Sequence, residues 1–269
     1  MRNVSLLSYL TISFGLLSLM ACDPVSESDR YIEMAPVEAH RSVLLEEFTG
    51  QYCPNCPTAH RTIEALQEQY GESLISVSIH AGSFAIPEGA FNHSPVYFST
   101  FLTPEGNQYA DEWGVTSYPC GIVNRTGGVQ MHTDWATSIR EAISKPSELD
   151  IQLSASVADG KVKSEVQLLP AKDLDGKLQV WLVEDSIASI QKDGAMMLTN
   201  YVHNNVYRAS FNGVGGTPVS LRQNVFQNYS YELSMDGKDW NSARLSVVAF
   251  VYNQQGVSQV RRSFVTIPE

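Results

Sequence analysis

The stretch VLLEEFTGQYCPNCPTAHRTIEALQEQYGESLISVSI, residues 43–79, decides the fold. Residues 43–48 are a short, mostly apolar run that suits a buried strand. Residues 57–70 carry apolar side chains at three- and four-residue spacing and are followed by Gly71, which predicts a helix and its end. Residues 74–79 predict a second strand. A strand, a helix and a strand at this spacing form a βαβ unit, which implies parallel pairing of the two strands.

The residues that follow this unit predict two further helices and a hairpin. The helices begin with capping and first-turn residues and occupy about 103–113 and 134–145. The hairpin pairs residues 121–124 with 129–132 around a Gly127-Gly128 turn. The region 41–146 is therefore predicted to be an α/β domain.

From residue 149 onward the pattern changes to alternating polar and apolar side chains. Seven short strand segments, separated by turn residues and without a helical stretch, favour an immunoglobulin-like β-sandwich over residues 147–269. Within it, YVHNNVYR (201–208) is predicted to be one strand with polar residues on its outward face, and His203 a surface or satisfied polar residue. The predicted fold class is α/β plus all-β.

The motif Cys53-Pro54-Asn55-Cys56 lies at the start of the first predicted helix. A Cys-x-x-Cys motif in this βαβ setting resembles the thioredoxin active site. Free N–H groups and the helix dipole stabilise a thiolate at Cys53, which makes it the predicted attacking sulfur, and Cys56 the predicted resolving cysteine. Zinc binding is the alternative, but it requires two further ligands, and the sequence has no second Cys-x-x-Cys or His-x-x-x-His.

The resemblance to thioredoxins extends to two more positions. Glu47 lies six residues before the first cysteine, where thioredoxins carry a buried acid that serves the resolving cysteine as a general base. The segment WGVTSYP (113–119) resembles the stretch that ends in a cis-proline opposite the thioredoxin site, and it implies that the Tyr118 backbone pairs with an incoming peptide. A solvent-facing Glu47 and a trans Pro119 remain open alternatives.

Cys120 departs from the thioredoxin pattern, in which threonine usually follows the proline. It is expected to lie close to the Cys53–Cys56 pair. Three interpretations stay open: a small buried thiol that packs as a hydrophobe, which is favoured, a thiol that exchanges disulfides with the pair, or a metal ligand together with His60 or His80. No metal site is assigned.

Residues 80–102 are an insertion longer than the basic thioredoxin fold requires. Its aromatic side chains are Phe84, Phe91, Tyr97, Phe98 and Phe101. They form either a lid beside the cysteines or, as favoured, a small satellite core under a long loop.

Residues 1–22 have the layout of a secretory signal, with Arg2, an apolar uncharged stretch and the ending Leu-Met-Ala-Cys. This ending resembles the lipobox of bacterial lipoproteins, which implies that Cys22 becomes the lipidated N-terminus and anchors the protein to a membrane. An uncleaved membrane helix and an ordinary secreted protein are the alternatives. Residues 23–40 contain five acids and one arginine and are predicted to form a solvated tether.

Composition and charge narrow the function classes. The chain has 18 Lys and Arg against 29 Asp and Glu, a net charge of −11, so a nucleic acid is not predicted as a partner. Charged residues make up only 17%, which is low for a globular protein and fits an exported β-rich one. No cofactor is predicted.

The whole chain resembles the twenty-eight-kilodalton outer-membrane protein family of Bacteroidota. The resemblance rests on the lipobox, the acidic tether, LLEEFTGQYCPNCP (44–57), the segment ending at Pro119, and YVHNNVYRASFNGVGG (201–216). It implies an outer-membrane lipoprotein, periplasmic or surface-facing, with a thioredoxin-like domain followed by a β-sandwich. The family's members have been regarded as adhesins or receptors.

Two function hypotheses follow. In the first, Cys53, Cys56, Glu47 and Pro119 carry out thiol–disulfide exchange with a protein thiol or disulfide substrate, with Tyr118 and Cys120 as accessory residues. In the second, the protein is a non-enzymatic adhesin or receptor that binds a surface ligand. The Cys53–Cys56 pair is then a structural disulfide.

Overall fold

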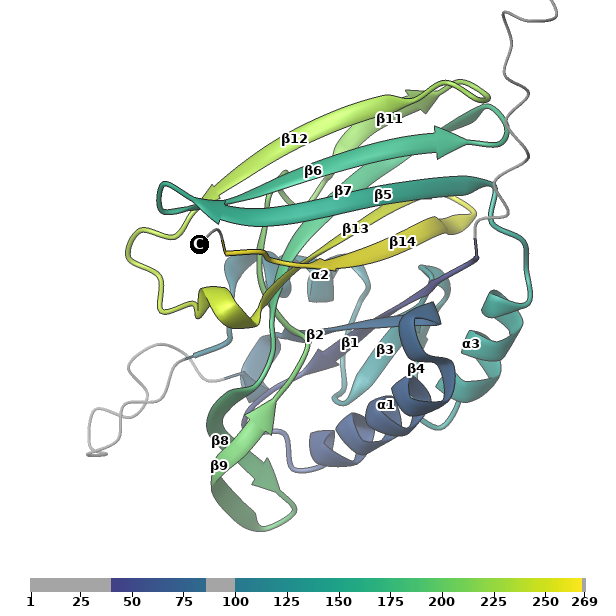
Figure 1. Ribbon diagram of the computed structural model, residues 1–269. Coiled ribbons are helices and arrows are strands. Elements are labelled where there is room, and N and C mark those ends of the chain that lie inside the picture. Colours follow the sequence, from purple (N-terminus) through teal and green to yellow (C-terminus); the bar gives the residue numbers. More distant parts are fainter. Residues whose placement is uncertain (1–39, 86–99, 268–269) are drawn as a thin grey trace, which may run out of the picture. The chain divides into compact units, whose positions relative to one another are not determined.

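The computed structural model describes residues 40–85 and 100–267 (Figure 1). The predicted signal segment with Cys22, the tether up to residue 39, and the aromatic insertion from 86 to 99 lie outside the described residues. Over the described ranges, no helix has the length and apolar character needed to cross a bilayer.

The first part of the described chain forms the predicted βαβ unit and its continuation. Its elements are β1 (Val43–Thr49), α1 (Cys56–Tyr70), η2 (Gly71–Ser73), β2 (Leu74–His80), η3 (Gly82–Phe84), α2 (Pro104–Glu112), β3 (Cys120–Val123), β4 (Thr126–Gln130) and α3 (Trp135–Ile143). β1 and β2 pair in parallel along their whole length, which confirms the predicted pairing. α2 also begins as predicted, because the Thr103 hydroxyl accepts a hydrogen bond from the Gly106 N–H at 2.9 Å.

The hairpin turn between β3 and β4 lies at Asn124 and Arg125, and the predicted turn at Gly127-Gly128 is wrong. Asn124 and Arg125 have φ of 50° and 53°, and the two glycines belong to β4. Asn tolerates this left-handed conformation, and the Asn124 Oδ1 accepts a hydrogen bond from the Leu44 N–H at 2.8 Å, which fixes the turn against β1.

The second part of the described chain contains ten strands, and the predicted number of seven is wrong. They are β5 (Leu149–Ala158), β6 (Lys161–Pro170), β7 (Leu174–Glu184), β8 (Ile187–Asp193), β9 (Met196–His203), β10 (Val206–Ser210), β11 (Thr217–Leu221), β12 (Gln227–Ser234), β13 (Leu245–Asn253) and β14 (Gly256–Phe264), with a short η4 (Ser242–Arg244). The stretch 201–208 is not one strand, because it spans the end of β9, a turn with Asn205 at φ 58°, and the start of β10. The paired strands β8 and β9 were not predicted.

One nine-stranded main sheet runs through both parts, in the order β14-β13-β7-β10-β2-β1-β3-β4, with β11 paired to β7. The segment β2-β1-β3-β4 has the thioredoxin-like order, with the parallel pair β1–β2 and antiparallel β3 and β4. The regions 41–146 and 147–269 join where β10 pairs with β2, and the Ser78 N–H donates to the Asn205 carbonyl at 2.7 Å. The fold is therefore a mixed α/β fold with additional small antiparallel sheets.

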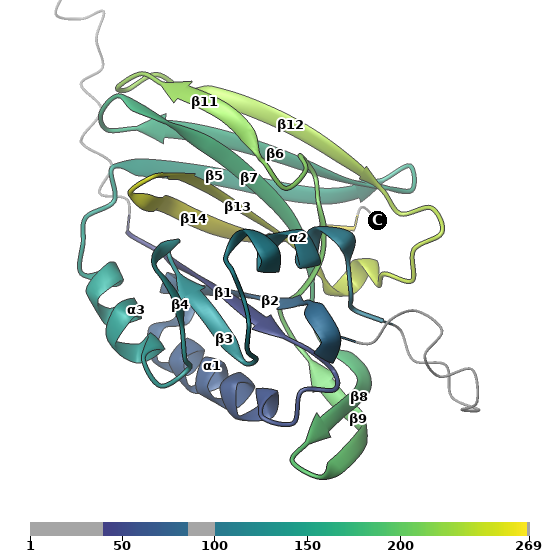
Figure 2. The same cartoon turned by 180° about the vertical axis from the view of Figure 1, so that it is seen from behind.

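The helices and the second sheet cover the main sheet in layers (Figures 1 and 2). α1 and α3 pack on one face of β1 and β3, where Ile63, Trp135 and Ile139 share a core with Val43 and Leu45. α2 packs on the opposite face. The three-stranded sheet β12-β6-β5 packs against β7, β11 and β13 through a separate aliphatic core. β1 and β2 are thus buried on both faces, so that their polar side chains, Glu46, Glu47, Ser76 and Ser78 among them, also lie in the interior.

The two ends of the described chain are bound to each other. The Gln259 side chain accepts from the Ser42 N–H at 3.0 Å and donates to the His40 carbonyl at 3.1 Å. The Arg41 guanidinium donates to the Val257 carbonyl at 2.9 Å, and the Arg261 guanidinium to the His40 carbonyl at 3.0 Å. β14 therefore secures the segment that enters β1.

Candidate functional site

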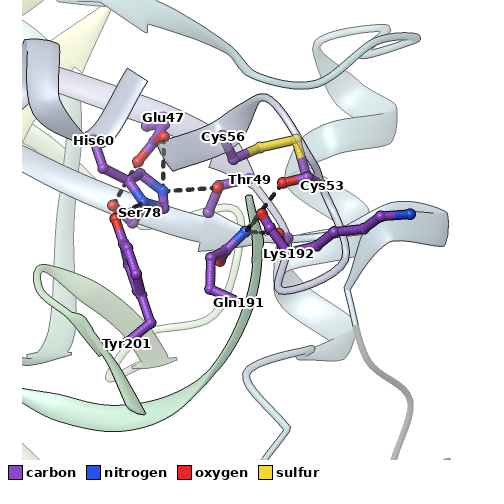
Figure 3. Close-up of a disulfide and its surroundings, with 10 residues drawn as sticks. Glu47, Thr49, Cys53, Cys56, His60, Ser78, Gln191, Lys192 and Tyr201 are labelled. Carbon is purple, nitrogen blue, oxygen red and sulfur yellow. Dashed lines mark hydrogen bonds and ion pairs between the residues drawn. A yellow bond between two sulfur atoms is a disulfide. The ribbon is translucent and has the colours of Figure 1, made fainter. Parts of the chain in front are cut away.

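Cys53 and Cys56 form a disulfide at the N-terminus of α1, directly after β1 (Figure 3). Both cysteines have no exposed surface. The two cysteines therefore lie where the sequence predicted them, at the start of the first helix. The complete burial of Cys53 was not predicted, because thiol exchange requires an incoming sulfur to reach one of the two sulfur atoms.

Glu47 lies in β1 and is fully buried, so the solvent-facing alternative is wrong. The Ser78 hydroxyl on β2 donates a hydrogen bond to Glu47 Oε2 at 2.7 Å. Glu47 Oε1 lies 3.3 Å from His60 Nε2 but accepts no well-formed hydrogen bond. A buried carboxylate with one oxygen left so weakly paired costs stability, and such groups concentrate at functional sites.

His60 lies one turn after Cys56 on α1, and its two ring nitrogens face different partners (Figure 3). Nε2 is 3.0 Å from the Thr49 hydroxyl and faces Glu47, whereas Nδ1 is 2.8 Å from the Tyr201 hydroxyl on β9. Burial alone lowers the pKa of His60, but the close contact with the charge of Glu47 outweighs burial and raises the pKa above its ordinary value. The sequence suggests His60 only as an alternative metal partner of Cys120, whereas its i+4 spacing from Cys56 is the local signal that places it at this site.

His80 and His203 are buried next to His60, so His203 is not a surface residue. The ring centroid of His203 lies 5.6 Å from that of His80 and 6.4 Å from that of His60. His203 Nε2 is 3.1 Å from the Ile190 carbonyl, whereas both His80 nitrogens and His203 Nδ1 have no hydrogen-bond partner. Burial, and for His80 the neighbouring His203, lower both pKa values, that of His203 to about 3. Both rings are therefore neutral near pH 7.

The Tyr118–Pro119 peptide bond is cis, as the thioredoxin resemblance predicted. Tyr118 is half-buried, and its ring packs at 5.8 Å, edge to face, against Phe84 of η3. The Phe84 carbonyl accepts a hydrogen bond from the Tyr52 N–H at 2.8 Å. The η3 turn therefore contacts both the proline loop and the loop that carries Cys53.

Cys120 is a free, buried thiol that lies opposite Phe48 in the β1–β3 pairing. Burial, and then the charge of Glu47, raise its pKa to about 12, so Cys120 stays a protonated thiol at neutral pH. It belongs to the same apolar core as Phe48 and Ile122. Within residues 40–85 and 100–267, no three or more His, Cys, Asp or Glu side chains are grouped to hold a metal ion. Packing as a hydrophobe is the interpretation that these observations favour.

The β8–β9 hairpin lies over the cysteine loop (Figure 3). The Lys192 N–H donates to the Gln51 carbonyl at 2.8 Å, and the Gly194 N–H donates to the Pro54 carbonyl at 2.9 Å. The buried Gln191 side chain donates to the Cys53 carbonyl at 3.0 Å. Sequence reasoning missed this contact, because it joins residues 138 positions apart and no local pattern marks it.

The comparisons with known proteins place the chain in a family. The family model described as outer membrane protein Omp28 matches residues 106–267, more than half of the chain. The chain belongs to the Omp28 outer membrane protein family. The matched residues begin within α2, so the Cys53–Cys56 disulfide and Glu47 lie outside the segment that defines Omp28 membership here. No curated protein sequence matches the chain.

Solved structures show how this Omp28-family chain is folded. HBP35 of Porphyromonas gingivalis is 15% identical, with a TM-score of 0.62 over 84% of this chain and 76% of that one. A protein from Agrobacterium tumefaciens is 14% identical, with a TM-score of 0.46 over 82% of this chain and 92% of that one. At these identities the likeness to HBP35 shows a shared fold.

Proposed function

We propose that this protein is a lipid-anchored thiol–disulfide exchange protein outside the cytoplasm, with Cys53 as the attacking and Cys56 as the resolving cysteine. The single observation that supports this function is the buried, weakly paired carboxylate of Glu47 on β1, the strand that leads directly into a disulfide at a helix N-terminus (Figure 3). A structural disulfide has no use for a buried, weakly paired acid, whereas a resolving cysteine needs a group that takes its proton.

The Cys53 thiolate attacks a substrate disulfide, forms a mixed disulfide and releases one substrate thiolate, which takes a proton from water. Cys56 gives its proton to Glu47, and its sulfur attacks Cys53 Sγ. The protein disulfide forms, the mixed disulfide breaks, and the second substrate thiolate leaves. The substrate disulfide is reduced and the protein dithiol is oxidised; disulfide formation in a substrate is the same sequence in reverse.

The buried disulfide must become accessible before exchange can start. Because Cys53 has no exposed surface, a substrate sulfur reaches it only after the cover over the cysteine loop opens. The β8–β9 hairpin holds that loop by the two backbone hydrogen bonds and the Gln191 contact described above. We assign the membrane attachment to Cys22, on the lipobox-like sequence alone, and place the folded part beyond an acidic tether.

A second candidate function is favoured by the same burial. If Cys53–Cys56 is a static bridge, the fold serves as a scaffold for a non-enzymatic receptor or adhesin, and the loops between the strands of 147–269 bind the ligand. The complete burial of both cysteines is the observation that favours this second function.

Trapping of a mixed disulfide separates the two functions. The full chain with Cys56→Ser is reduced and mixed with a disulfide-bonded peptide, and the covalent product is followed by mass spectrometry. Exchange predicts a mixed disulfide on Cys53 in this variant and none in Cys53→Ser. A protein that forms no adduct, and whose wild-type disulfide has a reduction potential far below about −300 mV, is a scaffold with a structural bridge.

A further inference from the structure

The two ring nitrogens of His60 connect Glu47 to Tyr201 of the β8–β9 hairpin. The three side chains form a continuous chain of polar contacts. Nε2 lies 3.3 Å from Glu47 Oε1, and Nδ1 lies 2.8 Å from the Tyr201 hydroxyl (Figure 3). A neutral imidazole accepts a proton on one nitrogen and releases one from the other, so a ring held between two polar groups conducts protons. Glu47 itself is fully buried and has no direct path to water.

The far side of this chain reaches a small cavity. The cavity has a volume of about 40 Å³, large enough for a water molecule, and is lined by His60, Tyr201, His203, Gln67, Glu64 and Val202 among others. Glu64 and Val202 are exposed on the surface. The cavity therefore lies between the His60 ring and bulk solvent.

We infer that His60 is a positioning residue that relays the proton taken by Glu47 from Cys56 to the solvent through Tyr201 and this cavity. The inference rests on the proposed thiol–disulfide exchange. In the resolving step, the Cys56 proton moves to Glu47, a proton moves from Glu47 to His60 Nε2, and the His60 Nδ1 proton leaves towards the Tyr201 oxygen and water. No electrons move along the relay, since the electron pair stays with the sulfur atoms.

The groups that face His60 support this assignment. Glu47 comes from β1, Glu64 and Arg61 from α1, His80 from β2, and Tyr201 and His203 from β9. Since His80 and His203 stay neutral, His60, whose pKa the charge of Glu47 raises, is the ring of the three that lies directly between an acid and a hydroxyl group. Removing the proton from Glu47 restores the carboxylate for the next turnover.

The relay also gives the hairpin a second contact with the reaction. Tyr201 lies in β9, on the same hairpin that carries Gln191 and covers Cys53. The contacts with the cysteine loop lie at the tip of the hairpin, at Lys192 and Gly194, whereas Tyr201 contacts His60 further along β9. Opening of the tip therefore exposes the sulfur atoms while the Tyr201 hydroxyl stays at His60 Nδ1.

Single-turnover kinetics of the full chain in detergent test the relay. The dithiol form is mixed with a fluorescent disulfide-bonded peptide between pH 5 and 9, and the resolving step is timed in wild type, His60→Gln and the control His132→Gln. Gln keeps a polar contact to Glu47 but does not titrate. We expect His60→Gln to resolve about tenfold more slowly at pH 7 and to lose one inflection from the rate–pH profile. His132, in the turn before α3, lies outside the site, and its variant should match wild type.

Tyr201→Phe guards against a folding defect in His60→Gln, because it keeps the ring and removes only the hydroxyl. It should slow the resolving step about threefold, the equivalent of one hydrogen bond, and add nothing in the double variant with His60→Gln. A His60→Gln protein with the wild-type rate and both inflections overturns the relay but leaves the exchange function standing. A wild-type protein that does not exchange with the peptide overturns the function and the relay together.

Discussion

Glu46 and Glu47 are neighbours on β1 and are both fully buried, yet they point to opposite faces of the sheet and have different partners. Glu46 receives two hydrogen bonds from the Arg125 guanidinium, at 2.7 and 3.0 Å. Glu47 receives one from Ser78 and faces His60, which gains or loses a proton. One acid is permanently neutralised by a fixed cation, and the other by a partner whose charge depends on pH.

Arg125, the partner of Glu46, is surrounded by aromatic rings. Its guanidinium carbon lies 4.3 Å from the centre of the Tyr252 ring and 4.8 Å from that of Phe250, with Trp181 and Tyr109 further out. Burial lowers the pKa of Arg125, but the charge of Glu46 outweighs burial and raises it above the ordinary value. The guanidinium of Arg125 is therefore a fixed cation. The difference teaches that burial alone does not make an acid a candidate for proton transfer; Glu47 also has an incompletely paired oxygen beside a titratable partner, and Glu46 does not.

The largest effect is expected from Arg125→Met. The variant leaves Glu46 charged, buried and unpaired, so the free energy of unfolding should fall by about 3–5 kcal/mol in denaturant titrations. The double variant Glu46→Leu/Arg125→Met removes both charges and should recover most of that loss. If the free energy of unfolding of Arg125→Met lies within about 1 kcal/mol of the wild-type value, Glu46 does not depend on its arginine, and the contrast between Glu46 and Glu47 is wrong.

Glu47→Gln should affect the rate more than the stability. The amide keeps its contacts to Ser78 and His60 but cannot take the Cys56 proton, so the resolving step should slow about a hundredfold, equivalent to about 2.7 kcal/mol in activation free energy. Stopped-flow measurement of the resolving step checks this, with Glu46→Gln as the matched variant. Glu46→Gln should lose stability and keep its rate. The opposite result for the two variants would exchange their roles.

The smallest expected effect is a pH-dependent loss of stability caused by His203, which lies beside His60. The pKa of His203 is lowered to about 3 in the fold, so the unfolded chain takes up a proton first as the pH falls below the ordinary value of about 6.5. Stability is therefore full above pH 6.5 and is lost between pH 6.5 and 3, by up to about 2 kcal/mol at pH 5. His203→Gln should flatten this part of the stability–pH curve measured by urea unfolding. A curve as steep as that of wild type would place the acid sensitivity in other groups.

The sequence predicted the parts of the fold that local patterns control. The βαβ unit, the Thr103 cap and the disulfide position follow from spacing and turn chemistry within a few residues. The turn at Asn124 was missed, because a glycine pair is a stronger local turn signal than Asn-Arg, and the contact of Asn124 with Leu44 lies 80 residues away. Tertiary contacts decided between the two turns.

Local patterns likewise predicted only those residues of the candidate site that lie close to the cysteines in the sequence. Glu47 was found by its spacing from Cys53, but nothing local distinguishes it from Glu46, whose partner Arg125 lies 79 residues further on. Gln191 and Tyr201 come from a hairpin that alternation alone did not separate from its neighbours, because β9 is mostly exposed and carries little apolar pattern. The cover over the cysteines is a property of the assembled chain.

The contact between the ends of the described chain has a consequence for the order of folding. β1, the first strand, is held at its entry by Gln259 and Arg261 of β14, the last strand, across more than 200 residues. Contacts at such separation form late, because the whole intervening loop must close first. We therefore expect the cysteine loop that follows β1 to reach its final position only after β14 has paired, so that the two thiols are accessible to oxidants until the sheet is complete.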